Sequence, residues 1–148
     1  MTAALAAAHE AGERGEVPVG AVVVRDDRML ASAGNASIAE HDPAGHAEVV
    51  VLRAAARAAR NYRLTGATLY VTVEPCLMCV GAALHARVER LVFGCADPKG
   101  GAAGSLYDVT DDPRLNHRIT VVSGVEDAAC RALLQQFFRA RRKSRATR

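Results

Sequence analysis

With 148 residues, half of them apolar, the chain is the size of one domain and long enough to bury a hydrophobic core without disulfide bonds. No apolar run approaches the roughly 18 residues of a membrane-spanning helix, and residues 1–15 lack the basic start of a signal peptide, so we expect one cytoplasmic domain over residues 1–148 with no membrane association. The net charge of +3 is modest, but basic residues crowd the last ten positions, as in segments that bind nucleic acid, although a solvated tail has the same composition. They are Arg139, Arg141, Arg142, Lys143, Arg145 and Arg148.

The first half of the chain predicts a helix, a hairpin and a second helix. Ala, Leu and Glu favour a short helix over residues 4–13. Two apolar stretches, residues 17–25 and 29–33, flank a pair of aspartates and predict a β-hairpin. Residues 36–45 are polar and contain a proline, so we expect a loop there, followed by a helix over residues 46–60.

The next segment predicts two buried strands with a helix between them. Residues 67–73 and 90–95 are apolar and short, as in strands covered on both faces. Pro75 suits the first position of a helix, where its missing N–H costs nothing. That helix, residues 76–86, has no charged residue, so we expect it to be covered on all sides.

The last segment predicts a loop, a strand and a final helix. The loop, residues 97–113, is rich in glycine, and residues 119–122 form a short strand. Ser123 and Glu126 have the spacing of a capping box, which predicts a helix start. The apolar stripe of this helix is expected at Val125, Ala128, Ala129, Ala132, Leu133 and Phe137. Strands that alternate with helices indicate an α/β sandwich with a mixed sheet.

Two short motifs together indicate a zinc site. His46, Cys76 and Cys79 can fill three of the four tetrahedral positions of zinc, which leaves the fourth for a water. A water bound to zinc has a pKa of about 7, so hydroxide is available near neutral pH. Glu48 can then carry protons from that water to the substrate. Because His46 and Glu48 would point to opposite sides inside a helix, they converge only if the helix begins at about His46.

Other uses of these residues compete with a catalytic zinc. A lone C-x-x-C also occurs in redox pairs and in structural zinc sites, and a structural site needs a fourth protein ligand. Cys95 and Cys130 could in principle be that ligand. A simpler interpretation of Cys95 is a small buried hydrophobe, and Cys130 lies near the apolar stripe of the last helix. The combination of His46, Glu48 and the cysteine pair favours catalysis.

The chain resembles the zinc-dependent cytidine/deoxycytidylate deaminase superfamily. The matching motifs are His46-Ala47-Glu48 and Pro75-Cys76-Leu77-Met78-Cys79, the H-x-E and P-C-x-x-C patterns of that superfamily. Within it, the chain is most similar to the branch that deaminates adenosine in bacterial tRNA. That further resemblance rests on residues 16–21, 61–64, 97–105 and 137–142.

The resemblance implies both a fold and an activity. The fold is a three-layer α/β/α sandwich with a five-stranded mixed sheet, in a homodimer with one zinc ion per subunit. The activity is hydrolysis of adenosine to inosine at the wobble position of tRNA, with an arginine tRNA as the expected substrate and its anticodon stem-loop as the binding partner. The small residues of helix 76–86 suit a dimer interface, although burial within the subunit explains them equally well.

The resemblance also implies substrate-binding residues. Asn35 would hydrogen-bond the target nucleoside, and Asp97 and Lys99 would contact the neighbouring ribose and phosphate. Three residues near the C-terminus would lie against the RNA: Phe138, Arg139 and Arg142.

Two alternative functions are open at this stage. The same zinc and glutamate serve deamination of a free base or nucleoside, such as guanine or cytosine. A zinc-stabilised RNA-binding module without catalysis has the same motifs, but a buried glutamate beside an open metal position would then be costly and unexplained.

Overall fold

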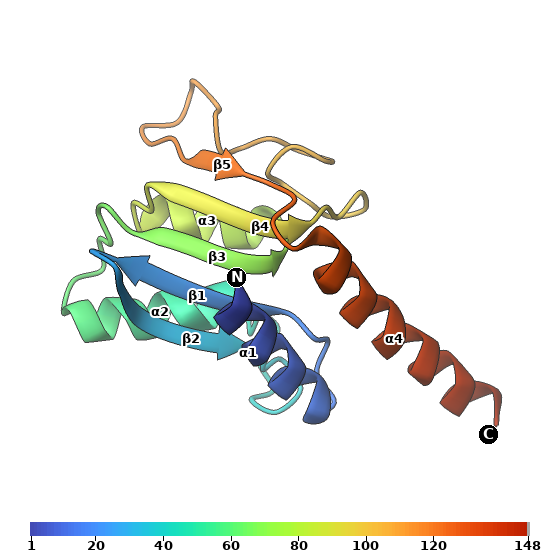
Figure 1. Cartoon of the computed structure of the whole chain (residues 1–148). Helices are drawn as coiled ribbons and strands as arrows, with labels where there is room; N and C mark the ends of the chain where they lie inside the picture. Colours follow the sequence, from blue (N-terminus) through green and yellow to red (C-terminus); the bar gives the residue numbers. More distant parts are fainter. Residues whose placement is uncertain (148) are drawn as a thin grey trace.

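The computed structural model describes residues 1–147 as a five-stranded sheet between two layers of helices (Figure 1). In chain order the elements are α1 (Thr2–Glu13), β1 (Gly20–Arg25), β2 (Arg28–Gly34), α2 (Ala47–Ala59), β3 (Thr68–Val73), α3 (Leu77–His85), β4 (Arg90–Cys95), β5 (Thr120–Val122) and α4 (Asp127–Ala146). The predicted elements are all present, and most of their boundaries are confirmed within one or two residues.

The sheet is mixed, as predicted. Its strand order is β2-β1-β3-β4-β5. β1 pairs antiparallel with both β2 and β3, whereas β3, β4 and β5 run parallel to one another. Helices α2 and α3 cover one face, and α1 and α4 contact the other (Figure 1). The predicted three-layer α/β/α sandwich is therefore confirmed.

Small residues allow the first helix to lie directly on the sheet. The inner face of α1 consists of alanines, with Ala4 and Ala8 fully buried. At the start of β1, a Cβ added to Gly20 would overlap the backbone of Ala4 and Ala8. This close approach of helix and strand backbones explains why the core is rich in alanine and poor in aromatic residues.

The start of α3 differs from the prediction for Pro75. The helix begins at Leu77, and Cys76 is its N-cap with an extended backbone at φ −76° and ψ 177°. Residues before it are held by neighbouring segments, because the Glu74 N–H donates to the Cys95 carbonyl and the Pro75 carbonyl accepts the N–H of Ala102. Pro75 therefore precedes the helix and does not occupy its first position.

The predicted capping box at Ser123 and Glu126 is wrong. The N-cap of α4 is Glu126 itself, in the left-handed region at φ 57°, and it makes no side-chain cap hydrogen bond. The N–H groups of Gly124 and Val125 donate instead to carbonyls at the end of β4. Because these two N–H groups are bound to β4, the helix begins only at Asp127.

The buried face of α4 agrees with the predicted stripe at Leu133 and Phe137 and differs from it elsewhere in the helix. Cys130 is the buried residue, and Leu133, Leu134 and Phe137 are partly buried beside it. The predicted Ala128, Ala129 and Ala132 are exposed. The basic C-terminal half of α4 extends beyond the sheet (Figure 1), and Arg148 lies outside the described residues.

Helix α3 is not covered on all sides by its own chain. Cys79, Val80 and Ala83 are buried, but Leu77 is 46% exposed and Met78 39% exposed. An apolar face of α3 is thus open to a partner. Among residues 1–147, no helix combines the length and apolarity that crossing a membrane requires.

Candidate metal centre and active site

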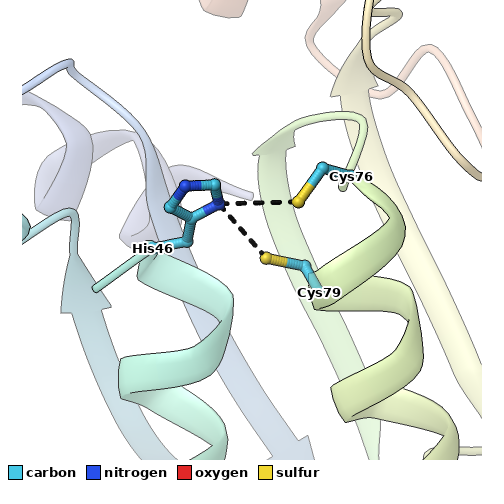
Figure 2. A group of neighbouring side chains, drawn as sticks. All are labelled: His46, Cys76 and Cys79. Carbon is cyan, nitrogen blue, oxygen red and sulfur yellow. Dashed lines mark hydrogen bonds between the residues drawn. The ribbon is translucent and has the colours of Figure 1, made fainter. Parts of the chain in front are cut away.

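His46, Cys76 and Cys79 meet between the starts of two helices (Figure 2). The sulfur atoms of Cys76 and Cys79 lie 3.6 Å and 3.4 Å from His46 Nδ1, respectively. A tetrahedral zinc ion, with sulfur at about 2.3 Å and nitrogen at about 2.0 Å, holds such ligands roughly 3.5 Å apart. The arrangement of these three donors therefore fits zinc.

The positions of the donors follow from the helix starts. His46 is the N-cap of α2, and Cys76 is the N-cap of α3. Cys79 lies three residues after Cys76 and faces the same side of α3. All three donors thus lie near the positive ends of helix dipoles, which favours the thiolate form of a cysteine.

The two thiols are strongly coupled. A hydrogen bond from Cys79 lowers the pKa of Cys76 to about 5, against the opposing effect of burial. The same hydrogen bond, together with burial, raises the pKa of Cys79. A metal ion bound between the two sulfurs would favour the ionised form of both.

Glu48 lies beside this cluster and is only 4% exposed. His46 has an extended backbone at φ −71° and ψ 148°, so its ring and the Glu48 carboxylate reach the same cavity from the first turn of α2. The predicted helix start at His46 is thus confirmed. Burial raises the pKa of Glu48 above its usual value, as is typical of carboxyl groups that exchange protons during catalysis.

The cluster opens into a cavity of about 560 Å³. Four of the predicted substrate-binding residues line it: Asn35, Asp97, Lys99 and Phe138. Arg139 and Arg142 are exposed on α4 and are not part of the lining. Asn35 also accepts the N–H of Ala47 at 2.8 Å, a contact that fixes the start of α2 next to His46.

Cys95 and Cys130 are not part of the cluster. Both are buried, Cys95 at the end of β4 and Cys130 on α4, where its sulfur packs against Gly94. Among residues 1–147, the group of donors able to hold a metal contains His46, Cys76 and Cys79. A centre with three protein ligands leaves one coordination position open, which is the pattern of catalytic zinc and not of structural zinc.

The sequence predictions missed two buried carboxylates, Glu16 and Glu74, of which Glu74 lines the cavity. Glu74 is 3% exposed and Glu16 is 2% exposed. Each accepts backbone N–H groups from a distant loop: Glu16 from Ile38 and Ala39, and Glu74 from the loop after β4. A single acidic residue at the end of the apolar stretch 67–73 was the available signal for Glu74.

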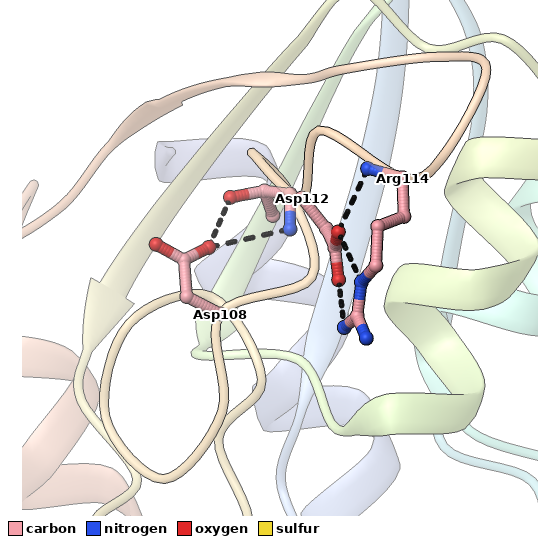
Figure 3. Close-up of polar contacts among 4 residues, drawn as sticks. Asp108, Asp112 and Arg114 are labelled. Atoms are coloured by element: carbon pink, nitrogen blue, oxygen red, sulfur yellow. Dashed lines mark hydrogen bonds and ion pairs between the residues drawn. The ribbon is translucent and has the colours of Figure 1, made fainter.

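The remainder of the long loop is ordered by local polar contacts (Figure 3). The Asp108 carboxylate accepts the hydroxyl of Thr110 at 2.7 Å, and Asp112 pairs with Arg114 at 2.7 Å. Hydrogen bonds from Arg114 lower the pKa of Asp112 to about 2. These contacts lie within residues 108–114, outside the lining of the cavity at the metal centre.

Comparison with known proteins agrees with this geometry. The family model described as "Cytidine and deoxycytidylate deaminase zinc-binding region" matches residues 1–95. The tRNA-specific adenosine deaminase of Haemophilus influenzae is 49% identical over 98% of this chain and 84% of its own length. The enzyme of the same name from Bacillus subtilis is 46% identical over 98% of this chain and 90% of its own length.

Solved structures extend the comparison to the fold. A structure from a study of A-to-I editing by tRNA:A34 deaminases at the wobble position of transfer RNA matches with a TM-score of 0.88 and 45% identity, covering 90% of this chain and 97% of that one. A guanine deaminase from Bacillus subtilis matches with a TM-score of 0.64 and 31% identity, covering 80% of this chain and 79% of that one.

Proposed function

Because this chain belongs to the cytidine and deoxycytidylate deaminase family, and within it to the tRNA-specific adenosine deaminases, we propose that it acts in the cytoplasm and deaminates adenosine to inosine at the wobble position of a tRNA. An arginine tRNA is the proposed substrate. The observation that carries the proposal is the open three-ligand cluster with Glu48 beside it, in a chain that is 49% identical to a tRNA-specific adenosine deaminase over 98% of its length.

The chemistry divides between the metal and the protein. Zinc, when held by His46, Cys76 and Cys79, supplies a Lewis acid that brings the pKa of a water to about 7. Glu48 takes a proton from the water that attacks C6 of adenine and delivers it to the ring nitrogen. As the C6–N bond breaks, Glu48 carries the second proton of the water to the leaving amine, so that ammonia and inosine are the products. Its burial suits this exchange, because the neutral form of the carboxyl is tolerated there.

The direct test is inosine formation in an RNA hairpin. Purified zinc-loaded protein is incubated with an arginine tRNA anticodon stem-loop, and inosine at the wobble position is measured by digestion and mass spectrometry. We expect conversion at that adenosine alone. Absence of inosine with zinc-loaded protein would contradict the proposal.

Deamination of a free base is the second candidate, supported by the likeness to a guanine deaminase. A cavity of about 560 Å³ is large enough for a free base as well as for a base turned out of an RNA loop. Guanine, cytosine, cytidine and adenosine are therefore assayed beside the RNA. A higher kcat/KM for any of them than for the stem-loop would favour this second function.

The C-terminal helix is proposed to hold the RNA through its phosphates. Arg139 and Arg142 are exposed on α4, and Phe138 on the same helix lines the cavity. We expect the double variant Arg139→Ala/Arg142→Ala to raise KM for the stem-loop. A plot of log affinity against log salt has a negative slope, and its magnitude should decrease by about 1 for each phosphate that the variant no longer neutralises. Affinity is measured by fluorescence anisotropy from low to high salt.

The matched control removes the same charge from another surface. Arg53 and Arg57 are exposed on α2, on the opposite face of the sheet from α4. Arg53→Ala/Arg57→Ala is expected to leave the salt slope unchanged. Equal salt slopes for the two double variants would show that Arg139 and Arg142 do not contact the RNA phosphates.

We also propose that the chain forms a homodimer through α3. The exposed apolar side chains Leu77 and Met78 and the half-buried Gly81 and Ala82 give this helix a face that a second subunit can approach closely. Light scattering is expected to give twice the 15.6 kDa mass of the chain. Ala82→Arg should shift the mass toward the monomer, while Ala128→Arg on the exposed side of α4 should not. A monomeric wild-type protein at micromolar concentration would contradict the dimer.

A further inference from the structure

Glu74 connects the end of β3 to both ends of the loop at residues 97–105. Its Oε2 accepts the N–H of Asp97 at 3.0 Å, and its Oε1 accepts the N–H of Ala103 at 3.2 Å and that of Ser105 at 2.9 Å. The hydroxyl of Ser105 donates to Oε2 as well. One buried carboxylate therefore accepts four hydrogen bonds from a segment that begins 23 residues later in the chain.

The loop is folded closely around this carboxylate. A Cβ added to Gly101 would overlap the carboxylate of Glu74 and would lie 2.7 Å from the carbonyl oxygen of Asp97. The N–H of Gly101 donates to that same carbonyl at 2.8 Å. Only glycine fits at this position, because the side-chain oxygens of Glu74 occupy the space that a methyl group would need.

The loop in turn places two residues in the wall of the active-site cavity. Asp97 and Lys99 both line that cavity, as does Glu74. The N–H of Lys99 donates to Asp97 Oδ1 at 3.1 Å, so the backbone at Lys99 follows the position of Asp97. A displacement of Asp97 would therefore move both residues that face the substrate from this side.

We infer that Glu74 is a positioning residue, which fixes the loop 97–105 in the conformation that binds the RNA substrate. The inference rests on the proposed tRNA substrate, but its structural part concerns the loop alone. Because the loop is already ordered, binding avoids the cost of ordering it, and the loss of Glu74 would appear mainly in substrate affinity. Glu74 does not act on the reacting atoms, and Glu48 retains that role.

The variant Glu74→Gln tests this arrangement with a minimal change of shape. A glutamine keeps one acceptor oxygen and replaces the other with a donor. If the amide oxygen of the glutamine accepts the N–H groups of Ala103 and Ser105, the amide NH₂ faces the N–H of Asp97. The Asp97 N–H then has no acceptor. We expect KM for the anticodon stem-loop to rise by about tenfold, the effect of one unsatisfied buried group, while kcat stays within about twofold and zinc stays stoichiometric. Amide hydrogen exchange at Asp97 and Lys99, followed by NMR, should become faster.

The control is Glu16→Gln, which removes a charge from an equally buried carboxylate that holds a different loop. It is expected to leave exchange within residues 97–105 unchanged, even where it lowers thermal stability. If Glu74→Gln does not fold, Ser105→Ala removes one of the four hydrogen bonds to the same carboxylate and should change exchange and KM in the same direction by a smaller amount.

The outcomes separate this inference from the proposed function. Unchanged exchange at Asp97 and unchanged KM in Glu74→Gln would overturn it. A loss of zinc, or a fall in kcat at constant KM, would also overturn it, because Glu74 would then act on the metal centre. If the wild type forms no inosine, the proposed function fails, and the exchange comparison still decides whether Glu74 holds the loop.

Discussion

Replacement of Glu48 by glutamine is expected to slow inosine formation by on the order of 10²- to 10⁴-fold, the usual contribution of general acid–base catalysis. The amide has nearly the same shape but cannot take a proton from the attacking water or return it to the ring nitrogen. The buried position beside the cluster is retained, so the protein should still bind zinc. Single-turnover rates at saturating enzyme isolate the chemical step, and atomic absorption gives the metal content.

The control for this variant is Glu13→Gln, an exposed glutamate at the end of α1. It should match the wild type in rate and in zinc. RNA binding by Glu48→Gln, measured by fluorescence anisotropy, should also stay near the wild-type value. Turnover that survives intact in Glu48→Gln would show that another group carries the proton. A wild type that binds RNA without turnover would instead favour the zinc-stabilised binding module.

The metal cluster could be predicted from the sequence because its donors are determined by local structure. Cys76 and Cys79 are three apart at the start of one helix, and the need for His46 and Glu48 to converge required a helix start at His46. Both conditions concern residues close together in the sequence. That α2 and α3 lie side by side was predicted on two grounds. Zinc needs more ligands than the two cysteines supply, and strands that alternate with helices place the helices against a common sheet.

Contacts between distant segments account for the errors. The capping box at Ser123 had the right residues, but the N–H groups of Gly124 and Val125 donate to carbonyls of β4, and local sequence contains no information about those acceptors. Glu74 was missed for the same reason, because its hydrogen-bond donors lie in the loop that follows the next strand. The apolar sequence of α3 predicted a covered helix but did not reveal whether the cover comes from the same chain or from a second subunit.

Replacement of Cys76 by alanine is expected to abolish stoichiometric zinc and, with it, inosine formation. Cys76 is the half-buried sulfur donor of the cluster, and a hydrogen bond from Cys79 lowers the pKa of its thiol to about 5. Its removal leaves His46 and Cys79, and two protein donors are too few for a stable tetrahedral centre. Zinc content after extensive dialysis is the direct measurement.

Thermal unfolding gives a second measurement that does not depend on activity. A metal that binds only the folded state stabilises it, so a chelator should lower the Tm of the wild type and leave that of Cys76→Ala unchanged. Cys130→Ala is the matched control, because Cys130 is buried against Gly94 and lies outside the cluster. It should lose some stability and keep full zinc. Full zinc in Cys76→Ala would remove Cys76 from the ligand set, and equal zinc loss in both variants would indicate that the metal depends on the packing of the fold and not on this donor.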